Sequence, residues 1–81
     1  MEDRVAVLAI IVENEANVET VNELLHEARK YIIGRMGIPY RKKNINVISL
    51  AVDAPQTFIS ELSGKLGQIE GVSVKTAYSN V

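Results

Sequence analysis

The chain has 81 residues, of which 47% are apolar, so it is long enough for one domain with its own core and too short for a second domain. Its formal net charge of −1 lacks the positive field that nucleic acids and anionic membranes require, and we expect neither as a direct partner. The sequence contains no cysteine, which excludes disulfides and thiolate-bound metal and leaves oligomerisation as the remaining way to stabilise so small a domain.

The first residues and the apolar segments indicate the compartment. Met1–Arg4 is acidic where a signal peptide would be basic. The longest apolar run, Val5–Val12, is too short to cross a bilayer. We therefore expect a soluble cytoplasmic protein.

Val5–Val12 is apolar at every position, which predicts a first strand that is covered on both faces. Helices of the same chain can cover one face of such a strand. A second copy of the chain is the simplest cover for the other face. A polar loop, Glu13–Asn17, ends the strand.

Apolar residues at three- and four-residue intervals predict a helix from about Val18 to Lys30. Asn17 is the first choice for its N-cap, and Asn14 is the alternative. His26, the single histidine of the chain, lies off the apolar stripe. We interpret it as a solvated surface residue rather than a ligand.

Ile32–Tyr40 predicts the second strand, because a residue before proline disfavours helix and two glycines weaken any helix placed over this stretch. Arg41–Asn44 is a polar hairpin connection in which Asn44 is suited to a positive φ. Ile45–Val52 follows as the third strand, with apolar or small residues in both of its alternating rows.

Asp53–Pro55 begins the predicted second helix, with the proline in the first turn, and Gly67 is placed to end it. Gly64 lies inside this helix, where glycine costs up to about 1 kcal/mol relative to alanine, so we expect a neighbour packed close to its backbone. Gln68–Gly71 is a turn, and Val72–Tyr78 alternates as a half-exposed fourth strand.

The order of these elements predicts one architecture. Right-handed crossovers and a short hairpin turn the order strand, helix, strand, strand, helix, strand into an α+β, ferredoxin-like βαββαβ sandwich. Its antiparallel sheet has the order 4-1-3-2, both helices lie on one face, and residues 1–81 form a single domain. The Glu13–Asn17 loop, the Arg41–Asn44 hairpin and the Gln68–Gly71 turn then meet at one end, where we would look for a small ligand.

The chemistries that this scaffold supports elsewhere need residues that the chain lacks. The first and third strands have no aromatic side chain on which RNA bases could stack, and the first loop has neither a cysteine pair nor an arginine and glycine cradle for phosphate. Gly34–Gly37 matches the GxxG of KH domains, but that loop joins two helices and this one continues into a strand. A lone histidine offers no nucleophile–base pair. We therefore expect no catalytic residue, no metal ligand and no cofactor.

Core packing leaves two glycine-containing stretches unexplained, Gly34–Tyr40 and Ser63–Gly67, each with a cation among glycines that let backbones approach closely. The plain interpretation is tight packing beside an ordinary surface cation. The sharper interpretation is contact with another subunit or with an effector. The candidate effector or interface residues are Arg35, Met36, Gly37, Tyr40, Ser63, Gly64, Lys65, Asn14 and Asn17.

Three stretches also carry a resemblance: Ile33–Tyr40, Leu62–Gly67, and Gly71-Val72 with Val74-Lys75. Together they resemble the iron-only hydrogenase system regulator family, and the likeness extends over essentially the whole chain. That family is similar in fold to ACT domains and to the C-terminal regulatory domain of the nickel-responsive repressor NikR. The resemblance implies an ACT-like, oligomeric regulatory module tied to the maturation or expression of iron-only hydrogenase.

The chain departs from both related folds at their binding sites. A NikR-type nickel site needs several histidines and a cysteine, and His26 stands alone. ACT modules often bind amino acids through a glycine in the first loop, and Glu13–Asn17 has none. No DNA-binding segment is present either, so regulation would act through a partner protein or an effector.

These observations lead to one expectation and one alternative. We expect a non-catalytic regulatory or assembly module that forms a homo-oligomer, a dimer or a tetramer, through its sheet and the sheet's edges. The alternative is a sensor of a small molecule, such as an amino acid or a metal ion, that binds between subunits near Arg35 and the Glu13–Asn17 loop.

Overall fold

The computed structural model describes residues 3–80 as a four-stranded sheet with two α-helices and three short 3-10 helices. No helix within these residues is long and apolar enough to cross a membrane. The elements in chain order are β1 (Asp3–Val12), η1 (Glu15–Asn17), α1 (Val18–Glu27), η2 (Arg29–Tyr31), β2 (Ile32–Tyr40), η3 (Arg41–Lys43), β3 (Ile45–Pro55), α2 (Gln56–Gly67) and β4 (Val72–Tyr78).

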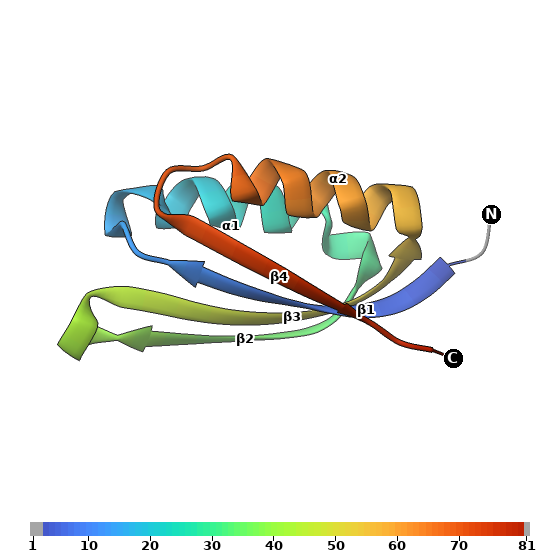
Figure 1. The fold of residues 1–81 in the computed structure, drawn as a ribbon, viewed down its shortest axis with the longest axis horizontal. Coiled ribbons are helices and arrows are strands. Elements are labelled where there is room, and N and C mark those ends of the chain that lie inside the picture. Colours follow the sequence, from blue (N-terminus) through green and yellow to red (C-terminus); the bar gives the residue numbers. More distant parts are fainter. Residues whose placement is uncertain (1–2, 81) are drawn as a thin grey trace.

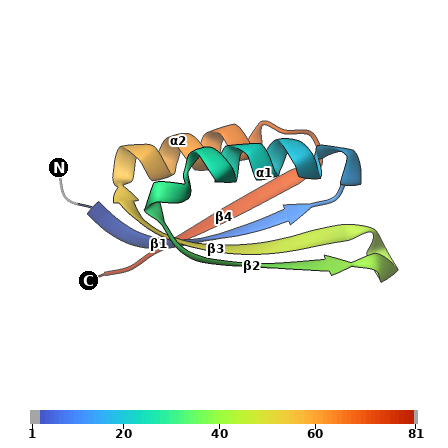
Figure 2. The ribbon, with the colours of Figure 1, turned by 180° about the vertical axis from the view of Figure 1, so that it is seen from behind.

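The sheet is antiparallel throughout and has the order β2-β3-β1-β4, which is the predicted order read from the other edge. Both helices lie side by side on one face of it, as the two opposite views show (Figures 1 and 2). The ferredoxin-like α+β prediction is therefore confirmed. In both views the β2–β3 hairpin extends away from the layer of helices.

The core lies between the helices and the face of the sheet that they cover. Every second residue of β1, from Ala6 to Val12, is buried there, and the intervening residues are not. Helix α1 contributes Val21 and Leu25 to this layer, and α2 contributes Ile59, Leu62 and Leu66. Apolar burial on one side of the sheet thus explains why the two helices pack where they do.

The start of α1 agrees with the prediction, but its capping does not. Asn17 occupies the predicted N-cap position of α1, but its side chain makes no capping hydrogen bond there. The alternative, Asn14, caps the preceding η1 instead, since its Oδ1 accepts a hydrogen bond of 3.0 Å from the backbone N–H of Ala16. Asn17 instead donates from Nδ2 to the backbone oxygen of Glu70 at 2.6 Å, which ties the first helix to the turn before β4. The helix also ends at Glu27 rather than at Lys30, because the chain tightens into η2.

Helix α2 begins later than predicted. Strand β3 continues to Pro55, because its last residues pair with Asp3 and the next residues of β1, and the helix starts only at Gln56. The left-handed backbone position after α2 is Gly71, with a φ of 78°, rather than Gly67. The positive φ predicted for Asn44 is confirmed at 55°.

Candidate functional site

The side of the sheet that faces away from the helices is not covered by any other part of residues 3–80. Residues that pair across an antiparallel sheet point to the same face. The exposed residues that alternate with the buried ones along β1, together with their pairing partners on the other strands, therefore form this surface. We call it the outer face. Its residues are Val5, Val7, Ala9 and Ile11 of β1, Gly34, Met36, Ile38 and Tyr40 of β2, Ile45, Val47, Ser49, Ala51 and Asp53 of β3, and Ser73, Lys75 and Ala77 of β4.

The outer face is mostly apolar and remains in contact with solvent. Val7 is 42% exposed and Ile11 is 39% exposed, although both belong to a central strand. The predicted cover of β1 on both faces is therefore confirmed on its inner side, which is buried, and stays a prediction on its outer side, which is exposed in the single chain. A contiguous apolar surface of this kind is unusual on a protein that acts alone, and such surfaces mark interaction sites.

The neighbouring edge strand is exposed along most of its length. From Ile33 to Tyr40 each residue of β2 is exposed, including Met36 at 59% and Ile38 at 49%. Edge strands with unpaired backbone groups and apolar side chains readily pair with other chains, and natural proteins usually protect them with charges or short length. The single charge on β2 is Arg35, which donates from Nη2 to Oδ1 of Asn22 in α1 at 2.9 Å.

The candidate residues of β2 point to two different sides of the sheet. Met36 and Tyr40 lie on the outer face, opposite Ser49 and Ile45 of β3. Arg35 and Gly37 lie on the other side of β2, opposite core residues of β3, and so turn toward the layer of helices.

The candidate residues of α2 are not brought close to those of β2. Ser63 is half-buried, and Gly64 and Lys65 are exposed. Helix α2 packs mainly over β4, which is the edge of the sheet opposite β2. The close neighbour expected at Gly64 is also missing: a Cβ built at Gly64 has no heavy atom of the described residues within 4 Å, apart from adjacent helix backbone.

The loop after β1 and the β2–β3 hairpin do meet, as the topology predicted. Glu15 and the hairpin residues 39–41 and 44–46 line a hollow of about 130 Å³. Arg35 is remote from this hollow. It pairs with Leu50 of β3, and Leu50 lies four residues, or about 13 Å, along the strand from Asn46, which lines the hollow. Within one chain, the residues of the sensor alternative therefore do not form one site.

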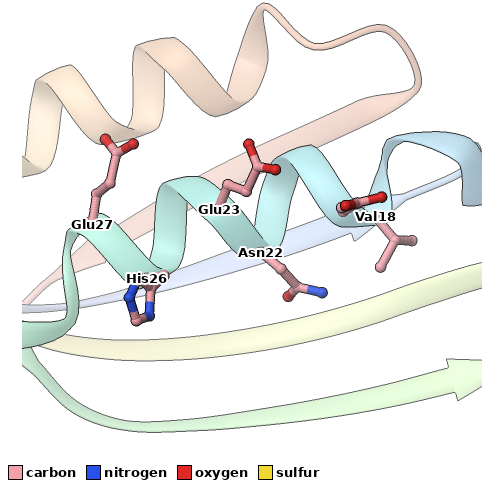
Figure 3. A pocket seen from close by; sticks show the side chains of 6 residues that line it. Val18, Asn22, Glu23, His26 and Glu27 are labelled. Carbon is pink, nitrogen blue, oxygen red and sulfur yellow. The ribbon is translucent and has the colours of Figure 1, made fainter.

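His26 lies on the exposed side of α1, which confirms its interpretation as a solvated residue. A shallow depression runs along this side of the helix and is lined by residues of α1 alone (Figure 3). Asn22 and His26 point from the helix toward the side of β2 and β3, whereas Glu23 and Glu27 point the other way (Figure 3). Within residues 3–80, no group of three His, Asp or Glu side chains is placed to share a metal ion.

One feature of the outer face was missed by the sequence analysis. A hollow of about 270 Å³, almost wholly apolar in its lining, lies over the small side chains of β3 and is flanked by β1 and β2. The available signal was the occurrence of glycine and alanine on neighbouring strands, but only the pairing register places them side by side. The lining residues are Val7, Gly34, Arg35, Met36, Ser49 and Ala51.

Comparison with known proteins gives a consistent result. The family model described as "TM1266-like: Iron-only hydrogenase system regulator, putative" matches residues 4–76. The solved structure of the uncharacterized protein TM1266 from Thermotoga maritima is 44% identical, covers 95% of this chain and 98% of its own, and superposes with a TM-score of 0.91. A search among curated proteins found no match.

A second solved structure extends the likeness to a larger protein. A formyltetrahydrofolate deformylase from Pseudomonas putida KT2440 superposes with a TM-score of 0.69 at 16% identity. The match covers 95% of this chain but 29% of the deformylase chain. At that identity the likeness concerns the fold alone.

Proposed function

Since this chain belongs to the TM1266-like family of iron-only hydrogenase system regulators, we propose that it is a non-catalytic regulatory module that works as a homo-oligomer. The observation that carries the oligomeric part of the proposal is the uncovered, apolar outer face of the sheet. The family description supports the regulatory and non-catalytic part.

The size of the outer face supports association through it. At about 4.8 Å between strands and about 3.3 Å per residue, four strands and nine residue positions give roughly 570 Å² in projection. Specific dimers bury about 800 Å² of accessible surface per partner. Accessible surface follows the contours of the side chains, so for the same patch it is larger than the projected area. A second copy that covers the outer face would thus remove the apolar side chains of β1 and β3 from water.

The mass of the particle in solution tests the oligomeric part. We expect the chain to elute as a dimer or tetramer at micromolar concentration in size-exclusion chromatography with light scattering. We expect Val47→Glu, which places a charge in the middle of the outer face, to dissociate it, because the carboxylate would lose its hydration in the interface. Thr57→Glu, on the exposed side of α2, is the matched control and should leave the mass unchanged.

A monomeric wild-type chain at these concentrations would contradict the proposal. Far-UV circular dichroism and urea unfolding of both variants establish that any change in mass does not arise from loss of the fold. Val47 is half-exposed in the single chain, so the charged variant is expected to fold.

The regulatory part requires a cellular test in a host with an iron-only hydrogenase. Deletion of the gene is expected to change hydrogenase activity or the level of its transcript. The wild-type gene and the Thr57→Glu variant should restore the original level, and Val47→Glu should not. Unchanged activity and transcript after deletion would contradict a role in the hydrogenase system.

The sensor alternative has one observation in its favour. The hollow between Glu15 and the β2–β3 hairpin offers a carboxylate, the Arg41 guanidinium and the amide of Asn44 within one small volume. Such a mixture suits a small zwitterion or a hydrated cation better than an apolar ligand. Thermal unfolding with single amino acids and divalent metal ions tests it: a ligand-dependent rise in Tm that Glu15→Gln removes would support a sensor.

A further inference from the structure

The outer face has a bulky row and a small row at two levels of the sheet. Ile11 of β1, Val47 of β3 and Ile38 of β2 are register partners and form the bulky row. These side chains are β-branched and rise as a ridge across three strands.

Four residues along β1 from the bulky row, the side chains become smaller. Val7, Ala51 and Gly34 are register partners at this level, and we call them the small row. The hollow of about 270 Å³ lies beside them. A Cβ built at Gly34 has no heavy atom of the described residues within 4 Å, so no packing within the chain requires glycine here. Glycine inside a strand often marks a bulge, such as the one at Ile33, or a place where another backbone approaches closely.

The small row depends on an irregularity in β2. Ile32 pairs with Val52, but the next paired residues are Gly34 and Ala51, because Ile33 is bulged out of register. Without this bulge Ile33 would stand opposite Ala51 and its side chain would fill the hollow. β-bulges are retained where they redirect side chains at a functional edge.

A third row, formed by Ala9, Ser49 and Met36, lies midway between the other two. Each outer row is two residues from it, or about 7 Å. Rotation by 180° about an axis along this central row therefore exchanges the levels of the bulky and small rows. We propose that two copies of the chain pack outer face to outer face about this axis, with the bulky row of each copy seated in the small row of the other.

This inference rests on the proposed homo-oligomer and gives it a specific geometry. The rotation places Val47 over Ala51 of the second copy and Ile38 over its Gly34, so the ridge of each sheet fills the hollow of the other. Aligned sheets pack about 10 Å apart with interdigitated side chains, which matches this arrangement. In a two-fold dimer each contact occurs twice.

The other simple two-fold axis fits less well. An axis parallel to the strands between β1 and β3 would lay Val47 over Ile11 and Ala51 over Val7. Bulky residues would then meet bulky ones, and the hollows would face each other as a void. The proposed axis does bring Lys75 near Lys75 of the second copy. Lys75 lies exposed on edge strand β4, however, where its side chain reaches solvent.

Exchange of two side chains tests the geometry. Ala51→Val fills part of the hollow, and Val47→Ala lowers the ridge that occupies it. We expect each single variant to raise the dimer Kd about tenfold, and the double variant, which exchanges the two side chains, to return to within about threefold of wild type. Sedimentation equilibrium measures the Kd, and urea unfolding of each variant confirms that the chain is folded. Thr57→Val on α2 is the control for added apolar surface.

The outcomes separate the inference from the proposal on which it rests. A monomeric wild-type chain would overturn both. An oligomer whose Kd is unchanged by the single variants would overturn the outer-face packing alone and leave the homo-oligomer standing. Single variants that weaken the dimer without recovery in the double variant would overturn the proposed axis.

Discussion

At the scale of single residues, the glycines of this chain serve different purposes. Gly71 has a φ of 78°, and a Cβ built on it would lie 3.1 Å from the Cβ and 3.3 Å from the backbone nitrogen of Asn14. Its carbonyl also accepts a hydrogen bond of 2.6 Å from the N–H of Glu13. Gly64, in contrast, has ordinary helical backbone and open space.

Alanine at these two glycines is expected to change stability in opposite directions. Gly71→Ala should lower the free energy of unfolding by about 1–2 kcal/mol, because a side chain is strained in the left-handed region and crowds Asn14. Gly64→Ala should raise it by up to about 1 kcal/mol, since alanine favours helix and meets no neighbour. Urea unfolding at one fixed chain concentration measures both, and a loss of stability in Gly64→Ala would refute the second expectation.

Sequence reasoning located these residues better than it explained them. The cost of glycine in a helix was foreseen at Gly64, but the close neighbour inferred from that cost is not found among the residues that the structure describes. Asn17 has the right residue type for an N-cap, yet its side chain reaches the backbone of Glu70, far along the sequence. Residue type gives a side chain's chemistry, whereas its partner depends on the tertiary fold.

At the scale of elements, β2 is the unusual one. Its two glycines lie on opposite sides of the sheet, since Gly34 pairs with Ala51 on the outer face and Gly37 pairs with the buried Ile48. At neither position does a built Cβ come within 4 Å of a heavy atom of residues 3–80, chain neighbours aside, and neither has a positive φ. A larger residue therefore fits the single chain at both positions.

Threonine at each position distinguishes stability from association. We expect Gly34→Thr and Gly37→Thr both to stabilise the isolated chain by up to about 1 kcal/mol, because threonine favours strands and glycine does not. Gly34→Thr alone should weaken self-association, since it partly fills the hollow on the outer face. Urea unfolding and sedimentation equilibrium provide the two readouts. Equal weakening of association by both variants would instead indicate pairing through the β2 edge.

The type and order of the elements followed from the sequence, but several boundaries did not. The predicted range of β2 is correct, because proline and glycine exclude helix over it. The extension of β3 to Pro55 comes from its pairing with the start of β1, which no local pattern reveals. The bulge at Ile33, on which the hollow depends, is likewise a product of pairing.

At the scale of the whole molecule, Arg4 joins three distant parts of the chain. Its Nη2 donates to the backbone oxygen of Ser79 at 3.1 Å, and its Nη1 donates to Oε1 of Gln56 at 3.2 Å. Its guanidinium carbon lies 4.5 Å from the centre of the Tyr78 ring, at cation–π distance. The start of β1, the start of α2 and the end of β4 are thereby fastened together.

Removal of this link is expected to destabilise the fold without changing its assembly. Arg4→Met keeps the aliphatic stem but loses the hydrogen bonds and the cation–π contact, which should cost about 1–2 kcal/mol of unfolding free energy. The dimer Kd should not change, because Arg4 pairs with the buried Ala54 and so lies off the outer face. Urea unfolding and light scattering of the same samples test both statements. A change in Kd would mean that the ends of β1 and β4 take part in the interface.

Whole-molecule features divide in the same way between what was predictable and what was not. The strand order was predictable, because right-handed crossovers and one short hairpin leave a single arrangement of these elements. The apolar character of the outer face followed from the continuous apolar run of β1. The relief of that face did not, since it requires the register of three strands and the position of one bulge.

The outer face is composed of residues from Val5 of β1 to Ala77 of β4, so it spans nearly the full length of the chain. A prematurely terminated chain that lacks β4 loses Ser73, Lys75 and Ala77 from this face and leaves β1 as an unpaired edge. In the proposed homo-oligomer, such a chain would offer its partner a narrower outer face beside an open strand edge.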